Sequence, residues 1–210
     1  MDAQTIRKIF ACFKKNNPHP TTDLVYNSPF ELLVAAVLSA RATDKSVNKI
    51  SGKLFSAANT PEKMLHLGEA NLKDHIKTIG LYQNKAKNIM KLSYILVHQH
   101  RSKIPSTREE LEALPGVGRK TSNVLLNMCF QKPVIAVDTH IFRVSQRIGL
   151  AKGKTPLAIE EQLMKVIPSE YLLNAHHWLV LHGRYTCIAR KPHCPTCIIN
   201  KWCEFPDKIF

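Results

Sequence analysis

Apolar residues recur at spacings of three and four along almost the whole chain, which is the period of an amphipathic helix. The first such stripe consists of Ile6, Ile9, Phe10 and Phe13. Among the 210 residues, only 134–137 have the character of a strand, and four apolar residues between Pro133 and Asp138 are weak evidence for one. The pattern therefore predicts an all-α fold.

Capping residues indicate where several of the helices begin. Ser28-Pro29-Phe30-Glu31 is a capping box with proline at the first helical position, and it opens a very apolar helix to about Ala40. Ser106-Thr107-Arg108-Glu109 is a second capping box, before a short helix. Later helices are expected at about 119–130, 139–148, 156–166 and 169–185.

No linker announces a domain boundary in this chain. Residues 22–132 hold enough helical pattern to form one bundle, whereas the C-terminal part needs support from elsewhere. The first helix is too short to fold alone, so we expect it to pack against that part. The predicted domains are 22–132, and 1–21 together with 133–210.

Charge is the first indication of a partner. The formal net charge is +14, and the basic excess is spread through the chain instead of gathering in a tail. Such a surface attracts a polyanion, although a merely basic soluble surface is the alternative. The longest apolar stretch, Leu32 to Leu38, is far shorter than the ~20 residues that span a bilayer. With no signal-peptide pattern at the start, we expect a soluble, cytosolic protein that binds no membrane.

The segment Leu114-Pro115-Gly116-Val117-Gly118-Arg119-Lys120 is the most informative stretch. Its two glycines permit positive φ and close backbone approach between two helices. The second helix then presents unpaired N–H groups, which suit a DNA phosphate, and Arg119 adds charge beside them. A plain turn between helices is the alternative, and the +14 charge favours phosphate binding. A nucleotide-binding P-loop is excluded because Arg119 separates the glycine from Lys120 and a helix precedes.

Lys120 and Asp138 are candidate catalytic residues. The helix dipole disfavours a cation in the first turn, which favours a neutral, nucleophilic amine at Lys120. From the side chain alone, a surface lysine is the commoner interpretation. Asp138, within Val137-Asp138-Thr139-His140, is either a helix cap or the carboxylate that Schiff-base chemistry uses for proton transfer. Their spacing in sequence does not show that the two meet.

Four of the six cysteines crowd the C-terminal end as Cys187-x6-Cys194-x2-Cys197-x5-Cys203. In a cytosolic protein this group indicates a metal site, and four thiolates suit either tetrahedral zinc or a [4Fe–4S] cluster. Metal ligation would hold Arg190 and Lys191 in a rigid loop that contacts phosphate, the alternative being a solvated basic loop. Cys12 and Cys129 are expected to be small buried hydrophobes. Three histidines could also be considered as metal ligands, but we interpret them as packing or capping residues: His176, His177 and His182.

The glycine hairpin, the Val137–His140 segment and the cysteine array together resemble the endonuclease III family of helix-hairpin-helix DNA glycosylases. The similarity runs from Asn17-Pro18-His19-Pro20 through His182-Gly183-Arg184-Tyr185-Thr186-Cys187. It implies a two-lobed fold, in which a six-helix bundle carries the hairpin and both chain ends build a cluster domain. It also implies an enzyme that removes oxidised pyrimidines such as thymine glycol and cuts 3′ of the abasic site by β-elimination.

The resemblance further implies residue roles. Lys120 would be the Schiff-base nucleophile, Asp138 the general acid/base, and the four C-terminal cysteines the ligands of a [4Fe–4S] cluster. The DNA contacts would come from Gly116, Val117, Gly118, Arg119, Arg190, Lys191, Arg41 and Leu81. Leu81 matches the family's wedge into the base stack. Arg41 stands where the family usually has the glutamine that fills the gap left by the flipped base.

Two other functions are considered beside the oxidised-pyrimidine enzyme. An adenine-specific mismatch glycosylase shares the hairpin and cluster, but that group normally lacks the lysine and carries a further C-terminal domain. A non-catalytic DNA-binding module with a structural metal would not need Lys120 or Asp138. The expected partner is double-stranded DNA with damaged bases or abasic sites, bound by a monomer in the nucleoid of a bacterial cytoplasm.

Overall fold

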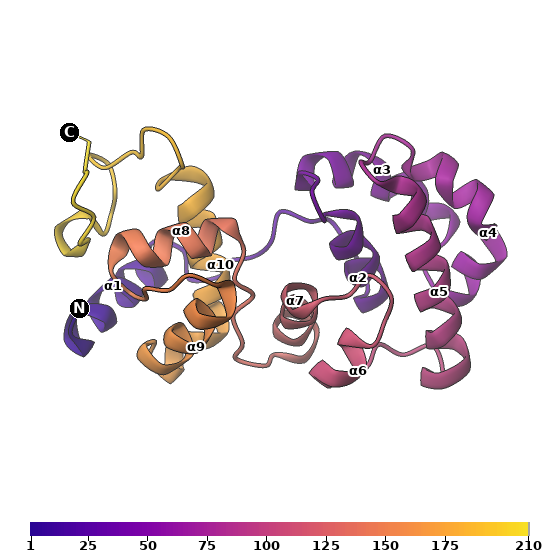
Figure 1. Ribbon diagram of the computed structural model, residues 1–210, viewed down its shortest axis with the longest axis horizontal. Coiled ribbons are helices and arrows are strands. Elements are labelled where there is room, and N and C mark those ends of the chain that lie inside the picture. The colour runs from indigo at the N-terminus through magenta and orange to yellow at the C-terminus, as the bar shows by residue number, and fades with distance from the viewer. Residues whose placement is uncertain (210) are drawn as a thin grey trace. The chain divides into compact units, whose positions relative to one another are not determined.

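The computed structural model describes residues 1–209, which contain ten α-helices, one short 3₁₀ helix and no strand (Figure 1). The predicted all-α class is thereby confirmed. Residues 134–137 form a connector without regular secondary structure, and its Ile135, Ala136 and Val137 are buried, which explains their strand-like composition. Within 1–209, no helix combines the length and the apolar character that crossing a membrane requires.

The chain divides into two compact units, each described here by itself. Unit 2 is the continuous stretch 22–130, and unit 1 combines 1–21 with the chain from Gln131 onward. Unit 2 contains six helices: α2 (Pro29–Leu38), α3 (Asp44–Ala57), α4 (Pro61–Ile76), α5 (Tyr82–His100), α6 (Arg108–Glu112) and α7 (Arg119–Phe130).

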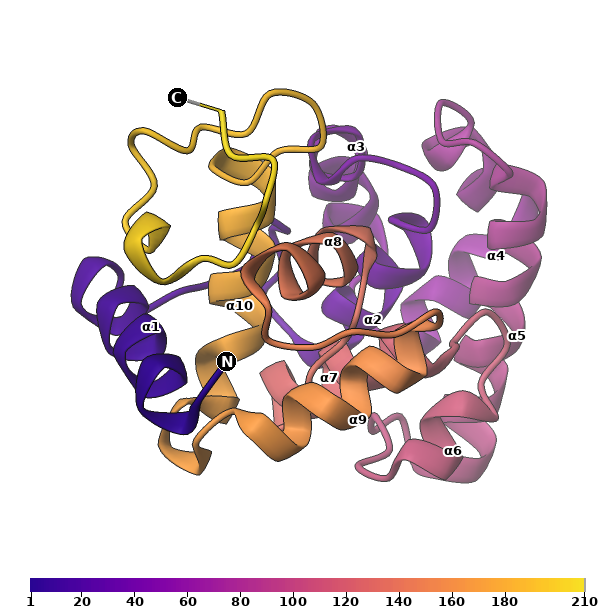
Figure 2. The same ribbon diagram turned by 60° about the vertical axis from the view of Figure 1, so that its left-hand side comes forward.

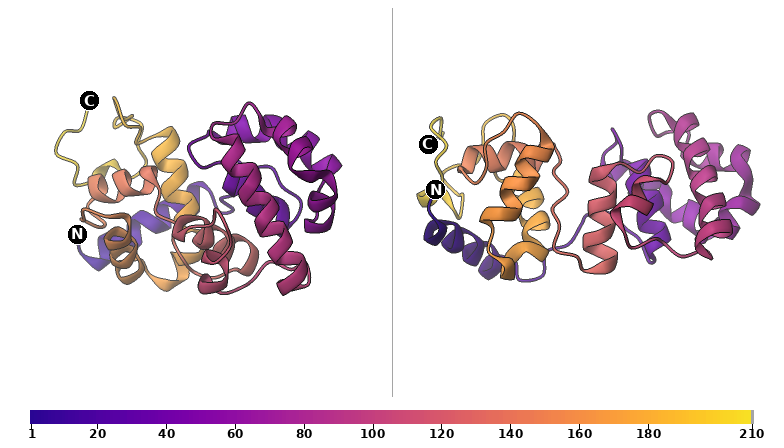
Figure 3. Two further views of the ribbon diagram at one scale, coloured as in Figure 1. Left: turned by 45° about the vertical axis from the view of Figure 1, so that its right-hand side comes forward. Right: turned by 60° about the horizontal axis from the view of Figure 1, so that its bottom comes forward.

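The apolar helix α2 is the centre of unit 2. All its residues from Phe30 to Leu38 are buried, and it packs against α3, α5 and α7. Helices α4 and α5 lie side by side at one end of the same unit (Figure 3). Gly68, at φ +79°, kinks α4 into two halves.

The helix starts follow the capping residues, with one correction. Ser28 caps α2 and accepts a hydrogen bond from the Glu31 N–H (3.2 Å). The predicted cap at Ser106 is wrong by one residue, because Thr107 caps α6 and accepts the Glu110 N–H (3.3 Å). Thr107-x-x-Glu110 is itself a capping box that overlaps the predicted one.

Unit 1 contains α1 (Ala3–Asn16), α8 (Thr139–Ile148), α9 (Pro156–Val166), α10 (Ser169–Tyr185) and the 3₁₀ helix Asn200–Trp202. The apolar stripe of α1 is buried in one core with α8, α9 and α10. The Trp178 indole N–H donates to the Asn17 carbonyl (2.8 Å) and so ties α10 to the end of α1. After α10, the segment 186–209 folds as loops around the 3₁₀ helix (Figure 2).

Candidate functional site

The hairpin between α6 and α7 is held by side-chain contacts across the two helices. The Arg108 guanidinium donates to Asn123 Oδ1 from both Nε (3.2 Å) and Nη2 (2.9 Å). The Ser122 hydroxyl donates to Glu112 Oε1 (3.1 Å). The Val117 N–H closes the turn on the Leu114 carbonyl (3.0 Å). These bonds make the turn a fixed platform at the start of α7.

The two glycines of the hairpin have different roles. Gly116 has φ +83°, and a Cβ there would lie 3.0 Å from Nδ2 of Asn88 on α5. Gly118 has nothing within 4 Å of a Cβ, and its carbonyl accepts the Ser122 N–H (2.9 Å) at the start of α7. Gly116 is therefore required by conformation and packing, whereas Gly118 leaves the approach to α7 open. Lys120 is exposed in the first turn of that helix, beside the exposed Arg119.

Gly116→Ala is expected to lower the free energy of unfolding by about 1–3 kcal/mol, because a side chain at positive φ is strained and Asn88 must move. Gly118→Ala is the matched control and should change that free energy by less than about 1 kcal/mol. Urea unfolding of the two variants beside the wild type measures both values. Equal destabilisation by the two substitutions would contradict the assigned difference.

Arg41 and Leu81 lie on two exposed turns of unit 2. Both adopt left-handed backbone conformations, with φ 56° at Arg41 and φ 61° at Leu81, and the Leu81 residue is 59% exposed. Lys85, which is buried, connects the turns. Its Nζ donates to the carbonyls of Leu38 (2.9 Å) and Ala40 (2.7 Å), and its backbone N–H donates to the Leu81 carbonyl (3.1 Å).

Asp138 begins α8 in unit 1. Its Oδ1 accepts the N–H groups of His140 and Ile141, each at 2.9 Å, so it is the N-cap that one interpretation of the sequence expects. The residue is half-buried, which leaves part of the carboxylate open to other groups. Lys120 belongs to unit 2, and its approach to Asp138 stays a prediction.

The four C-terminal cysteines converge in unit 1. Cys187, Cys194, Cys197 and Cys203 all line one cavity between the end of α10 and the loops that follow. The pKa of the Cys197 thiol is raised to about 11, mainly by burial and in smaller part by the three neighbouring cysteines. Within 1–209, no group of three or more His, Cys, Asp or Glu side chains is already arranged as a metal site.

Two arginines of α8 hold Cys187 and the start of the loop that follows it. Arg143 donates to the carbonyls of Gly183 (2.7 Å) and Cys187 (3.1 Å). Arg147 donates to the carbonyls of Ile188 (2.8 Å) and Ala189 (2.9 Å), with Nη1 3.6 Å from the Cys187 Sγ. The same helix that presents Asp138 at its start therefore fixes the cysteine loop.

Three comparisons place these features among known proteins. The sequence profile of the HhH-GPD superfamily base excision DNA repair proteins matches residues 34–169. Endonuclease III of Haemophilus influenzae is 57% identical over 202 residues, covering 96% of each chain. Endonuclease III of Rickettsia prowazekii is 56% identical over 210 residues, covering 100% of this chain and 99% of its own. This chain belongs to the endonuclease III family.

A solved structure agrees with the sequence relatives. It is a trapped covalent intermediate of endonuclease III with DNA, in an estranged-adenine complex, and it matches with a TM-score of 0.90 at 42% identity. The match covers 97% of this chain and 96% of the other. The predicted family, fold and enzyme class are thereby confirmed, and the chain is a base excision repair DNA glycosylase with abasic-site lyase activity.

The structure also places the remaining residues that the sequence analysis named. Arg190 and Lys191 are exposed on the loop between Cys187 and Cys194. Burial lowers the pKa of His182 to about 4, so this histidine is a neutral packing residue against Phe13. Cys12 and Cys129 are half-buried, which corrects the expectation that they are buried. Cys12 packs against the outside of the unit 1 core, and its thiol donates to the Ile198 carbonyl (3.5 Å).

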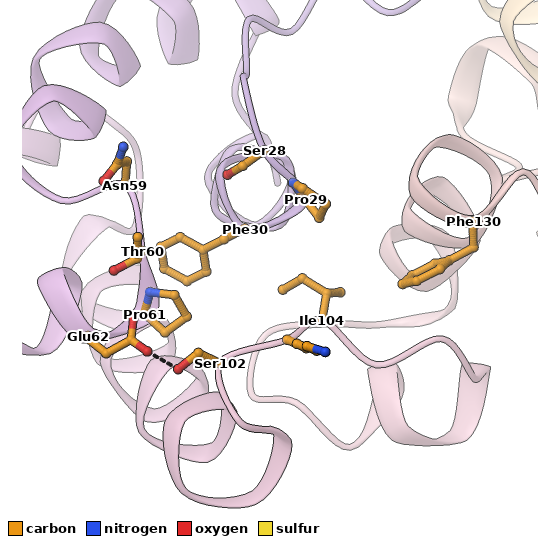
Figure 4. A pocket seen from close by; sticks show the side chains of 11 residues that line it. Ser28, Pro29, Phe30, Asn59, Thr60, Pro61, Glu62, Ser102, Ile104 and Phe130 are labelled. Carbon is orange, nitrogen blue, oxygen red and sulfur yellow. Dashed lines mark hydrogen bonds between the residues drawn. The ribbon is translucent and has the colours of Figure 1, made fainter.

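A larger cavity of about 480 Å³ in unit 2 contains none of the predicted site residues (Figure 4). Its walls are the starts of α2 and α4, the turn after α5 and the end of α7, and they are mostly apolar. The polar contact drawn there is the Ser102 hydroxyl on the Glu62 carboxylate, which lowers the pKa of Glu62. This bond connects the end of α5 to the start of α4.

Sequence reasoning missed Lys85, Arg143 and Arg147. Lys85 carried a usable signal, because it falls on the apolar stripe of α5 that continues through Ile89, Leu92 and Leu96. A lysine on a buried stripe needs a polar partner, and carbonyls at a helix end are a common one. The two arginines carried no comparable signal, since their partners lie more than 35 residues further along the chain.

Proposed function

We propose that this enzyme removes oxidised pyrimidines such as thymine glycol from double-stranded DNA and cuts the strand 3′ of the resulting abasic site. The observation that carries the proposal is the position of Lys120. This lysine is exposed in the first turn of α7, directly after a glycine turn that leaves the backbone open. An amine in that position can reach a sugar whose phosphate lies against the turn.

In the first step of the proposed reaction, the damaged nucleotide leaves the base stack so that its sugar becomes accessible. The Lys120 amine attacks the anomeric carbon, and the bond from that carbon to the base breaks. The base departs with the bonding electron pair and takes up a proton. Opening of the sugar ring then leaves a Schiff base between Lys120 and the deoxyribose.

In the second step, a proton is lost from the sugar carbon next to the imine, and the 3′ phosphate leaves by β-elimination. Water hydrolyses the imine and releases Lys120. We assign the proton transfers to Asp138, whose carboxylate is half-buried at the start of α8. Its Oδ1 is engaged by two N–H groups, which leaves Oδ2 as the oxygen for this role.

The proposed DNA contacts come from exposed residues of each unit and from the backbone of Val117, whose side chain is buried. Gly116, Val117, Gly118 and Arg119 would bind phosphate at the hairpin, and Arg190 and Lys191 would bind it at the cysteine loop. Arg41 would fill the gap left by the flipped base, and Leu81 would enter the stack. The proposed assembly is a monomer on damaged duplex DNA, in the nucleoid of the bacterial cytoplasm.

The cysteine cavity supports a [4Fe–4S] cluster as the resident group. Four thiolates also suit a tetrahedral zinc ion, and the resemblance to the endonuclease III family favours the cluster. A cluster takes one thiolate at each of its irons, which suits four cysteines spread around one cavity. With four protein ligands, the cluster would be fully coordinated and would stabilise the loop that carries Arg190 and Lys191.

Cys203→Ser is expected to remove most of the protein's iron and its brown colour, because one of the four thiolate ligands is lost. Cys12→Ser is the matched control in the same unit, since Cys12 lies outside the cavity, and it should keep both. Metal analysis and the visible spectrum of anaerobically prepared protein measure the effect. A colourless wild-type protein loaded with zinc would contradict the cluster.

Borohydride trapping tests the proposed function as a whole. The wild-type protein is incubated with one duplex that contains thymine glycol and another that contains an abasic site. We expect a covalent protein–DNA adduct on both duplexes, and strand cleavage when borohydride is omitted. Tight binding without adduct or cleavage would identify a non-catalytic DNA-binding protein. Preferential release of adenine from a mismatch would identify the adenine-specific activity instead.

A further inference from the structure

Lys85 joins two exposed turns that are separate in the sequence. Its ammonium group donates two hydrogen bonds at the C-terminal end of α2, to the carbonyls of Leu38 and Ala40. These carbonyls belong to the helix end where the backbone lacks partners and the helix dipole is negative. The Lys85 backbone N–H makes the first helical hydrogen bond of α5, to the Leu81 carbonyl. The Lys85 side chain therefore anchors the first turn of α5, which follows Leu81, to the end of α2, which precedes Arg41.

Each of the two turns carries a strained residue. Arg41 follows the bonded carbonyl of Ala40 directly, and both Arg41 and Leu81 have positive φ. Residues other than glycine keep this conformation only where their surroundings hold it. Among the contacts described for these turns, Lys85 is the one that reaches both, and it does so from a position only 5% exposed.

We propose that Lys85 is a positioning residue that sets the Arg41 and Leu81 turns at the spacing needed to enter the DNA stack together. This inference rests on the DNA contacts proposed above for Arg41 and Leu81. Lys85 itself touches neither the DNA nor the reacting sugar. Its effect is confined to substrates in which a base stack and an opposite strand are present.

Burial of the ammonium group is unfavourable and lowers the pKa of Lys85, so simple packing would be better served by an apolar side chain. A methionine has similar length and would fill the same space. It cannot donate to the carbonyls of Leu38 and Ala40. The comparison of lysine with methionine at this position therefore removes the charged donor and its two hydrogen bonds while keeping the packing.

The test compares Lys85→Met with wild type on an abasic site in duplex DNA and on the same site in a single strand. Borohydride trapping rates are measured on both. We expect a loss of about tenfold on the duplex and less than about twofold on the single strand. Lys91→Met removes an exposed lysine from the same helix and should leave the ratio of the two rates unchanged.

A second readout follows the base stack directly. A 2-aminopurine opposite the abasic site reports by its fluorescence whether the turns enter the gap. Lys85→Met should reduce the change in fluorescence on binding, even at protein concentrations that saturate the DNA. Lys85→Gln keeps a donor and should show a smaller loss in the same direction. If Lys85→Met does not fold, Lys85→Gln replaces it in both measurements.

Two results would overturn the positioning role while leaving the proposed function intact. One is an unchanged duplex rate with an unchanged fluorescence signal in Lys85→Met. The other is an equal loss on duplex and single strand, which would mean a general effect on the fold. Absence of trapping by the wild-type protein on either DNA would refute the proposed function itself, and with it the role of Lys85.

Discussion

Lys120→Ala is expected to abolish borohydride trapping and to lower the rate of strand cleavage by about 10³-fold or more, because the nucleophile of the proposed reaction is removed. The fold should be unaffected, since Lys120 is exposed and substitutions at such positions change stability by less than about 0.5 kcal/mol. Single-turnover cleavage of a duplex with one abasic site measures the rate.

Two control variants separate chemistry from charge. Lys120→Arg keeps the positive charge at the start of α7 but cannot form the imine, so it should bind DNA and remain inactive. Lys53→Ala removes an exposed lysine of α3 and should keep full activity. An adduct formed by Lys120→Ala at the wild-type level would refute the assigned nucleophile.

Asp138→Asn is expected to lower the cleavage rate by about 10²–10³-fold with little loss of stability, because it removes the proton acceptor but keeps the helix cap. The asparagine Oδ1 can still accept the N–H groups of His140 and Ile141. Asp138→Ala should lose activity to the same degree and also about 1 kcal/mol of stability, since the cap itself is gone. Single-turnover rates and urea midpoints of both variants measure the two effects.

The two Asp138 variants distinguish the interpretations that the sequence leaves open. If Asp138 were only a cap, Asp138→Asn would react at the wild-type rate and only Asp138→Ala would be impaired. If the carboxylate transfers protons, both variants are slow and only one is unstable. If the cleavage rate fell only in the variant that also lost stability, the catalytic role of Asp138 would be contradicted.

Local signals predicted most of the helices. The bounds of α8, α9 and α10 match the expected ranges, because each begins at a polar residue or proline that the sequence displays. The start of α6 was misplaced because Ser106-x-x-Glu109 and Thr107-x-x-Glu110 overlap. Both are capping boxes, and nothing in the local sequence decides between them.

The candidate site was predicted unevenly, for a physical reason. The hairpin and the cysteine array are local motifs, so their residues are identified by spacing alone. The contacts that position them are long-range: Lys85 reaches Ala40 across 45 residues, and Arg143 reaches Cys187 across 44. Such pairs form only when whole helices pack, and a single sequence does not display helix packing. Resemblance to the endonuclease III family supplied the roles and left these supporting contacts undescribed.

The split composition of unit 1 has a consequence for synthesis on the ribosome. Helix α1 is made first, yet its core partners α8, α9 and α10 are made only after all of unit 2. Until then its four apolar side chains have no core to enter, while unit 2 can already fold behind it. The four C-terminal cysteines are synthesised later still. The apolar face of α1 therefore stays without its core partners, and prone to aggregation, until nearly the whole chain has been translated.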